Sequence, residues 1–516
     1  MAQQKSENRI IPEERGNSFQ TPSVEGGKAV PVNKVMMQLN LNFATAEYPR
    51  GVTAAVEADL SAPTAGEAPK AESSGEIGTS TGMMEEVTKQ LTRALHKVVA
   101  NKGAPGADGV TIQQFKQDWK MVHPKLAAAL RTGTYSPGEI RRVEIPKASG
   151  GKRKLGIPNV VDRVVQEAIR GALEPLYEPR FHPNSHGFRP DRSSHTAIAV
   201  ANRYLSDGLE IVVDLDLEKF FDRVCHQRLL ARLAHRVSDK RLLKLIGQML
   251  KSEVVLNDGM TRRAVEGVPQ GGPLSPLLSN IVLDELDWEL DRRGLHFVRY
   301  ADDLQVFVRS VRAGERVMAS LTRFIEGRLR LKVNAAKSAV SRSEERSFLG
   351  FRLSVDPLEA EVKCHPSPRS LKRIKARIRE LTPRNWGGSM SSCIRGVNKY
   401  LRGWYGYFQI CSQDAEYYFQ GVDARIRRRL RALQLKQWKR KKTMARQLIS
   451  LGVRRRTAWQ GVYRGRQSLW KLSHTPAVNR GLRNAYFASR GLFSLKANHQ
   501  RRHQAILARE QLTLFG

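Results

Sequence analysis

Apolar residues recur at helical spacing in three stretches of the chain, MMEEVTKQLTRALHKVVA, LKRIKARIREL and ARIRRRLRALQLKQW. Their apolar stripes are Val87, Leu91, Leu95 and Val98, then Leu371, Ile374, Ile378 and Leu381, then Ile426, Leu430 and Leu433. Residues three or four apart share one face of a helix, so each stretch is predicted to be an amphipathic helix. Lys and Arg are the commonest residues at the other positions of the second and third stretches, and the chain after residue 364 is therefore expected to be helical and basic.

Alternation with a period of two predicts strands in the region before residue 364. RRVEIPKASGGKRKLGIP has apolar residues at Val143 and Ile145, a Ser-Gly-Gly turn and a basic return strand, which indicates a hairpin. LEIVVDLDLEKFF is a β-branched apolar run, typical of a buried strand, that ends in acidic residues. LHFVRYADDLQVFVRS predicts a second hairpin with Asp302 and Asp303 at its bend, and LDELDWELDRRG before it predicts a helix.

Composition and pattern together divide the chain into four parts. Residues 1–82 are rich in Ala, Gly, Ser, Thr, Glu and Pro, and we expect them to be a disordered extension because such a stretch buries too little apolar surface to offset its ordering entropy. Residues 83–364 mix helices and strands. Residues 365–495 are expected to form a helical region, and residues 496–516 a short basic tail.

The distribution of charge points to the kind of partner. The chain carries 87 Lys and Arg against 50 Asp and Glu, a formal net charge of +37. Residues 365–516 hold 34 of these basic residues and only five of the acidic ones. A solvated surface usually mixes both signs, so this excess favours a polyanionic partner, and nucleic acid before a membrane surface.

The sequence lacks the patterns of membrane-spanning, secreted, zinc-binding and disulfide-rich proteins. No stretch approaches the roughly 18 apolar residues of a membrane span, and the N-terminus resembles neither a signal nor a transit peptide. Cys225, Cys364, Cys393 and Cys411 form no Cys-x-x-Cys pair, so neither a zinc site nor a disulfide framework is indicated. Cys393 and Cys411 could share a ligand, although unpaired buried thiols are the simpler interpretation. We expect an intracellular protein.

Acidic residues stand on two elements that should otherwise be apolar. Asp214 and Asp216 share one side of the predicted strand, because side chains two apart point the same way. If this strand lies beside the bend with Asp302 and Asp303, two or three carboxylates converge, and such oxygen-only ligands are what Mg²⁺ takes. Two such ions can drive an in-line displacement at phosphorus. The alternative is a set of separate turn and cap aspartates that never meet.

Two further segments could complete a nucleotide site. GVPQGG is a loop that lets the backbone approach a flat group, and Ser275 after it is a plausible N-cap of an apolar helix. Lys147, Lys152 and Arg153 lie on the first predicted hairpin, where cations could hold a triphosphate. An ordinary loop-to-helix junction and solvated strand charges explain each segment equally well when it is taken alone.

The order of the motifs resembles that of the reverse transcriptase–maturases encoded by group II introns. The resemblance runs from about residue 90 to about residue 495. It includes NKGAPGADGV, IPKASGGKRKLGIPNVVDRVVQEAI, FHPNSHGFRPDRSSHTAI, DLDLEKFFDRVCH, GVPQGGPLSPLLSNIVLDELD, RYADDLQVF, LKVNAAKS, FLGF and YLRGWYGYF, in the family's order. It implies a right-hand polymerase fold, with α/β fingers and palm over residues 83–364 and an α-helical thumb and maturase region after them.

The resemblance also implies roles for the acidic residues. Asp216 and Asp302 match the metal-binding aspartates of the palm, and Asp303 completes the catalytic set. Leu217 would lend a backbone carbonyl to one of two Mg²⁺ ions. Asp214 lies outside the family's motif and receives no role.

Five residues match the family's nucleotide-binding positions: Lys147, Arg153, Phe221, Gln270 and Lys337. Lys147 and Arg153 would hold the triphosphate, and Gln270 would lie beside the incoming nucleotide. Phe221 would pack under the sugar and reject a ribose 2′-hydroxyl, whereas Phe220 is expected in the core. Lys337 would lie near the leaving pyrophosphate, and the Thr that usually follows it is Ser338 here.

The resemblance leaves three functional hypotheses. In the first, the protein binds structured intron RNA, assists its splicing and copies it from a DNA primer with deoxynucleoside triphosphates, in the cytoplasm at the nucleoid of a bacterium, with a homodimer left open. In the second, the polymerase serves DNA repair or phage defence. In the third, disfavoured because every inferred catalytic position is intact, it is a non-enzymatic splicing factor. No His-Asn-His nuclease motif follows residue 495, so second-strand cleavage would need another source.

Overall fold

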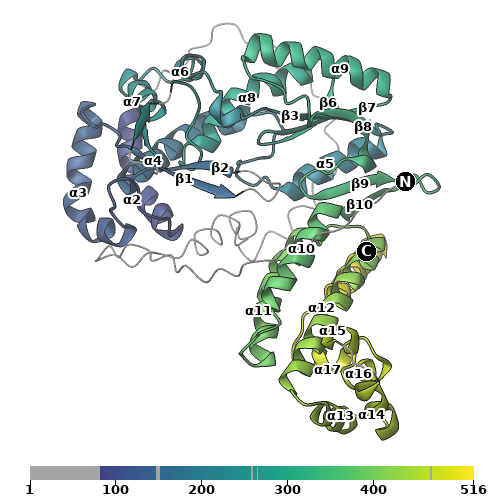
Figure 1. Cartoon of the computed structure of the whole chain (residues 1–516). Helices are drawn as coiled ribbons and strands as arrows, with labels where there is room; N and C mark the ends of the chain where they lie inside the picture. Colours follow the sequence, from purple (N-terminus) through teal and green to yellow (C-terminus); the bar gives the residue numbers. More distant parts are fainter. Residues whose placement is uncertain (1–81, 147–151, 257–259, 264, 465–467, 516) are drawn as a thin grey trace, which may run out of the picture. The chain divides into compact units, whose positions relative to one another are not determined.

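The computed structural model (Figure 1) describes residues 82–146, 152–256, 260–263, 265–464 and 468–515. The extension predicted to be disordered and the Ser-Gly-Gly turn lie outside the described residues, apart from Gly82. The first described helix begins at Met83, where the sequence predicts one, and it buries all four residues of its predicted stripe. No helix among the described residues is long and apolar enough to cross a membrane.

The described strands form two four-stranded sheets and a separate hairpin. Their bounds are β1 (Ile140–Pro146), β2 (Lys152–Ile157), β3 (Ile211–Asp216), β4 (Glu253–Val255), β5 (Thr261–Arg263), β6 (His296–Tyr300), β7 (Asp303–Val308), β8 (Ala339–Arg342), β9 (Phe351–Val355) and β10 (Val362–Pro366). The sheet orders are β2-β1-β4-β5 and β6-β7-β3-β8, and β9 pairs with β10. Both predicted hairpins are confirmed, because β1 pairs antiparallel with β2 and β6 pairs antiparallel with β7.

Helices make up most of the remaining described chain. Their bounds are α2 (Met83–Ala100), α3 (Ile112–Thr132), α4 (Val160–Tyr177), α5 (Ser194–Ser206), α6 (His226–Ala234), α7 (Lys240–Leu250), α8 (Ser275–Arg292), α9 (Val311–Phe324), α10 (Pro368–Leu381), α11 (Met390–Phe408), α12 (Glu416–Gln437), α13 (Lys441–Ser450), α14 (Arg455–Tyr463), α15 (Leu469–Leu472), α16 (Pro476–Gly481), α17 (Asn484–Ala488) and α18 (Leu495–Phe515). Short turns are the 3₁₀ helices η2 (Glu178–Arg180), η3 (Phe220–Asp222), η5 (Ser343–Glu345) and η6 (Gln413–Ala415) and the π-helix η4 (Ile325–Leu329). An α/β part is thus followed by a helical part, as predicted.

The sheet β6-β7-β3-β8 is covered on both faces. Figure 1 shows α9 on one side of it and α5 on the other. Alternate residues of β3 follow this division: Val213 joins the core that contains α9 residues, and Val212 joins the core that contains α5 residues. Burial of both faces explains why the sequence of β3 is a continuous apolar run rather than a clean alternation.

The helical part shares the second of these cores. Ile374 of α10 and Ile426, Leu430 and Leu433 of α12 are buried in the same cluster as Val212. The predicted stripe of α12 is confirmed in full, while Leu371 and Leu381 at the ends of the α10 stripe are only partly buried. Residues 496–515, expected as a short basic tail, lie in α18.

One local prediction is wrong. Ser275 is not the N-cap of α8 but its first helical residue, and Leu274 precedes it without a side-chain capping bond. The Ser275 hydroxyl donates to the Pro269 carbonyl at 2.6 Å instead. It therefore closes the GVPQGG loop onto the helix, which a local capping pattern cannot distinguish from capping.

Candidate active site

Two aspartates face each other where adjacent strands end. Asp216 is the last residue of β3, Asp303 is the first residue of β7, and the antiparallel register pairs them directly. Asp302 occupies the two-residue bend between β6 and β7, after Ala301, whose φ of 57° lies in the left-handed region. Few non-glycine residues adopt this conformation, so the surrounding contacts must hold the bend in place.

Arg299 supplies these contacts. Its guanidinium, with 1% of the side chain exposed, donates to the Ala301 carbonyl at 2.9 Å. It also donates to both carboxylate oxygens of Asp287 in α8, at 2.7 and 2.5 Å. The Asn280 amide oxygen at 3.1 Å and the Ser185 hydroxyl at 2.7 Å accept its remaining bonds. The bend is thus anchored to α8 and to residues 184–187.

The segment at residues 184–187 packs directly under the bend. The Arg299 amide donates to the Asn184 carbonyl, and the His186 amide donates to the Arg299 carbonyl. A Cβ atom on Gly187 would overlap the backbone nitrogen of Ala301 and would lie 2.9 Å from its Cα. Only glycine therefore allows this approach. Sequence reasoning assigned no role to Arg299 or to its partners, although the quoted motif SHGFR contains Ser185 and Gly187.

The carboxylates of the bend are electrostatically strained. Burial, and then the charge of Asp216, raises the pKa of Asp302, while the guanidinium groups of Arg153 and Arg299 oppose the shift. Desolvation by the surrounding protein, and then the charges of the neighbouring aspartates, raises the pKa of Asp303 to about 7, although its side chain is exposed. The site therefore holds more negative charge than its surroundings compensate.

Asp216 has partners from the segment after η4. The Asn334 side-chain amide donates to one carboxylate oxygen at 2.9 Å, and Lys337 Nζ lies 3.2 Å from the same oxygen. The Asn334 backbone amide donates to the Asp216 carbonyl, and Ser338 accepts from the Asp216 amide at 3.0 Å. The structure thus brings Lys337 to a predicted catalytic aspartate 121 residues away in the chain.

Asp214 has a different set of neighbours. It pairs with Gln305 in the register of β3 and β7, and the Gln305 amide lies 3.5 Å from its carboxylate. Arg346 lies 3.9 Å from its other oxygen. This carboxylate has its own polar and basic neighbours.

The GVPQGG loop connects the two sheets. The Gly156 amide of β2 donates to the Gln270 carbonyl at 2.8 Å, and a Cβ atom on Gly271 would lie 2.5 Å from the Gly156 carbonyl. On the other side, the Val268 amide donates to the Phe221 carbonyl at 2.6 Å. Gln270 and Phe221 are therefore held on one loop system between β2 and β3.

The remaining predicted residues divide between exposed and buried positions. Arg153 is exposed on β2, close enough to affect the pKa of Asp302. Phe220 is 2% exposed, as expected of a core residue, and Phe221 beside it is partly buried. Leu217 is buried and bridges Val333, and Lys147 lies outside the described residues.

The described residues do not form a preformed metal site of several His, Cys, Asp or Glu side chains. Across the described ranges, no group of three or more His, Cys, Asp or Glu side chains has the arrangement of a metal site. The four cysteines are free, and Cys364, Cys393 and Cys411 are buried. The site presents the carboxylates of Asp216 and Asp303 at two strand ends, where a cation could bind. Lys337 lies beside Asp216, where it could contact a phosphate.

Comparisons with known proteins identify this region. Residues 145–353 match the family model for reverse transcriptases (RNA-dependent DNA polymerases), and residues 371–450 match that for the maturase-specific domain of group II introns. Protein YkfC of Escherichia coli (strain K12) is 35% identical over an alignment of 304 residues that covers 51% of this chain and 80% of YkfC.

Two proteins associated with introns are also similar. The putative COX1/OXI3 intron 2 protein of Saccharomyces cerevisiae is 29% identical over 331 aligned residues, which cover 52% of this chain and 38% of that protein. The group II intron-encoded protein LtrA of Lactococcus lactis subsp. cremoris is 34% identical over 202 aligned residues, which cover 38% of this chain and 32% of LtrA. The chain therefore spans less than two fifths of either intron protein.

We predict that Gly187→Ala destabilises the fold, because the added methyl group must displace the backbone of the bend. The midpoint of thermal unfolding should fall by several degrees, the shift expected for a loss of about 1–3 kcal/mol on overpacking. Gly421→Ala is the matched control, since its Cβ meets nothing within 4 Å and α12 gains a better helix former. Equal midpoints for the two variants would contradict the close approach at Ala301.

A second prediction concerns Asp303 and pH. A carboxyl group whose pKa is raised in the folded state lowers the free energy of unfolding of the protein as the pH rises. For Asp303 this decrease falls between its unfolded-state pKa near 4 and its folded-state pKa of about 7. Asp303→Asn should therefore be more stable than the wild type at pH 8 without divalent ions, and the difference should shrink toward pH 4. Chemical denaturation across this range measures it.

Asp356→Asn serves as the control with the opposite sign. The Lys363 ammonium beside Asp356 lowers the pKa of that carboxyl, so its substitution should reduce stability at pH 8 and have less effect at low pH. If Asp303→Asn instead destabilises the protein at pH 8, the carboxylates at the bend are compensated and the electrostatic description of the site is incorrect.

Proposed function

The chain belongs to the group II intron reverse transcriptase–maturase family, and we propose that it is an RNA-directed DNA polymerase that binds intron RNA, assists its splicing and copies it into DNA. The observation that carries the proposal is the pairing of Asp216 with Asp303 beside the bend at Asp302, within the region that matches reverse transcriptases. The basic helical region, which contains the maturase-specific match, supplies the RNA-binding surface.

The site fits divalent cations. The raised pKa values of Asp302 and Asp303 indicate carboxylates whose charge the protein leaves incompletely neutralised. All the donors are hard oxygens, which Mg²⁺ prefers. Asp216, Asp302 and the Leu217 carbonyl would hold Mg²⁺, and two bound ions would supply activation of the primer 3′-hydroxyl and neutralisation of the leaving pyrophosphate.

The residues around the carboxylates would bind and orient the nucleotide. Lys337 is positioned beside Asp216 to contact the leaving pyrophosphate, and Arg153 on β2 to contact the triphosphate, together with Lys147. Phe221 would form the surface under the sugar of the incoming deoxynucleoside triphosphate, and Gln270, joined to it through one loop system, would lie beside that nucleotide. Because the loop is tied to both sheets, a shift of β2 would move the triphosphate contacts and the sugar contacts together.

The polymerase proposal predicts that Asp302→Asn reduces Mg²⁺-dependent extension of a DNA primer on an RNA template by more than about a hundredfold, since loss of such electrostatic stabilisation typically costs ~3 kcal/mol or more. Asp214→Asn is the matched control. This substitution removes a carboxylate from the face of β3 that also carries Asp216, but Asp214 has its own neighbours in Gln305 and Arg346. The Asp214→Asn variant should therefore extend primers at a rate close to that of the wild type. An Asp302→Asn variant that keeps more than about a hundredth of the rate would refute the two-metal assignment.

The same variant separates polymerase chemistry from the maturase role. Asp302→Asn should keep the wild-type affinity for intron RNA and any assistance to splicing, because the basic helical region is unchanged. Filter binding and a splicing assay on candidate intron RNA measure these two properties.

The sugar-contact proposal predicts that Phe221→Val incorporates ribonucleotides more readily, relative to deoxyribonucleotides, than the wild type does. The smaller side chain leaves room for the 2′-hydroxyl. Phe324→Val removes a similarly half-buried ring from the same core and should leave discrimination unchanged. If a folded, active Phe221→Val enzyme keeps the wild-type preference for deoxyribonucleotides over ribonucleotides, Phe221 has a purely structural role.

A further inference from the structure

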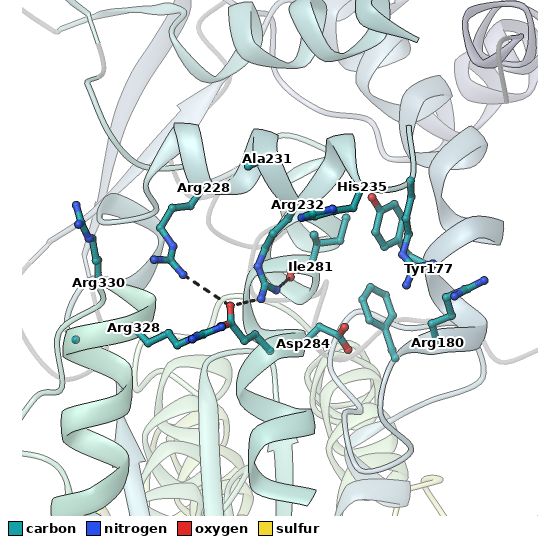
Figure 2. A pocket seen from close by; sticks show the side chains of 14 residues that line it. Tyr177, Arg180, Arg228, Ala231, Arg232, His235, Ile281, Asp284, Arg328 and Arg330 are labelled. Carbon is teal, nitrogen blue, oxygen red and sulfur yellow. Dashed lines mark hydrogen bonds and ion pairs between the residues drawn. The ribbon is translucent and has the colours of Figure 1, made fainter. Parts of the chain in front are cut away.

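A strongly basic cavity lies away from the carboxylates of the catalytic sheet. It has a volume of about 850 Å³, and none of the predicted catalytic or nucleotide-binding residues lines it (Figure 2). Its wall is formed by residues of α6, α8 and η4, by the last residues of α4 and η2, and by residues just after η2, α6 and η4. Six of them are arginines: Arg180, Arg228, Arg232, Arg236, Arg328 and Arg330.

The acidic residues of the wall neutralise only part of this charge. Glu285 is shared by three arginines: Arg232 contacts it directly, Arg328 lies 2.7 Å away and Arg228 lies 3.7 Å away. Asp284 is the other acidic residue of the lining. Desolvation, and then the charge of Asp287, raises the pKa of Asp284 to about 6. Even with both carboxylates ionised, four of the six positive charges are left uncompensated.

Two of the arginines are available to a ligand. The exposed side chains of Arg180 and Arg330 have no hydrogen bond or ion pair with any described residue. Figure 2 shows them on opposite sides of the cavity, with Arg228 and Arg232 between them. Arg330 follows η4 with a φ of 56°, a conformation that few non-glycine residues adopt. A ligand that reaches both arginines must carry negative charges that are spaced apart.

The aromatic residues of the wall indicate which part of a nucleic acid would bind. Tyr177 and Phe181 stack on each other with ring centroids 6.3 Å apart, and they are only 6% and 4% exposed. The guanidinium carbon of Arg236 lies over the Tyr177 ring, 5.9 Å from its centroid. Neither of these two rings offers a free face to a base, and the exposed His235 is the remaining ring of the lining. Recognition would depend on phosphate groups, which guanidinium groups bind in bidentate fashion.

We propose that this arginine cavity binds consecutive backbone phosphates of RNA, independently of base sequence, as a contact separate from the basic helical region. The proposal rests on the proposed function, because it assumes that structured RNA is the protein's partner. Six guanidinium groups spread over the wall, with Tyr177 and Phe181 both closed to a base, suit a phosphate backbone better than a free nucleotide. The contact would tie the α6–α8–η4 surface to the RNA while the catalytic sheet works on the primer end.

The test is the full-length double variant Arg180→Gln/Arg330→Gln, which removes two charges but no hydrogen bond or ion pair of either side chain with a described residue. Its affinity for intron RNA at low salt should fall at least about tenfold, and the log–log salt slope should become shallower by about one to two units, as two phosphate contacts are lost. The rate of primer extension on a short saturating primer–template should equal that of the wild type.

Arg312→Gln/Arg316→Gln is the matched control. Both residues are exposed on α9, outside the cavity, and neither has an ion-pair partner among the described residues. This control should bind RNA within about twofold of the wild type. Equal losses in the two double variants would mean that net charge, not the cavity, determines affinity, and an unchanged affinity in the cavity variant would overturn the proposal outright.

Inorganic tripolyphosphate distinguishes the two sources of phosphate. If calorimetry shows tripolyphosphate binding that the cavity variant loses, while its RNA affinity stays at the wild-type value, a free polyphosphate is the ligand and the RNA assignment is wrong. Failure of this proposal and failure of the proposed polymerase activity give different experimental results. A wild-type protein that fails to extend primers would refute the polymerase, whereas RNA binding that depends on Arg180 and Arg330 would still stand.

Discussion

The buried ion pair between Arg299 and Asp287 is the interaction on which the candidate site depends. Both side chains are almost fully inaccessible to solvent, so their charges must compensate each other. Such a pair contributes little net stability compared with apolar residues, but loss of one partner typically costs about 3–5 kcal/mol because the other charge is left buried alone. The pair holds together α8, β6 and residues 184–187, and through the Ala301 carbonyl it also holds the bend that carries Asp302.

This anchoring allows the protein to keep carboxylates where they repel. The bend holds Asp302 and Asp303 where burial and neighbouring carboxylates raise the pKa of both groups. The rigid support under Ala301, with Gly187 in direct contact, maintains the arrangement. A site of this kind is preorganised for positive charge, because its repulsion is relieved only when a cation arrives.

The elements that could be predicted from sequence are those whose signal is local. The stripes of α2 and α12 and the hairpins at 140–157 and 296–308 follow from spacing alone, and Asp216 beside Asp303 follows once two adjacent strands are placed antiparallel. The support of the site is not local. Arg299 finds its partners 12, 19 and 114 residues away, and Lys337 meets Asp216 at 121 residues. No periodicity encodes such pairs, and the roles predicted for Phe221 and Gln270 came only from a family resemblance. The Ser275 error has the same origin, because a hydroxyl near a helix start can cap the helix or close a loop.

The two cores that meet at β3 explain how one strand can serve both halves of the protein. Val213 packs with the α9 side and Val212 with the core that continues through α10, α11 and α12. Further contacts join the same regions: the His195 ring bonds the Tyr407 carbonyl at 2.7 Å, and the Tyr407 hydroxyl donates to the Leu349 carbonyl at 2.7 Å. Because protein interiors are close-packed, a displacement of the basic helices would also disturb the packing around β3. The basic helical region is therefore joined by a shared core to the strand that ends in Asp216.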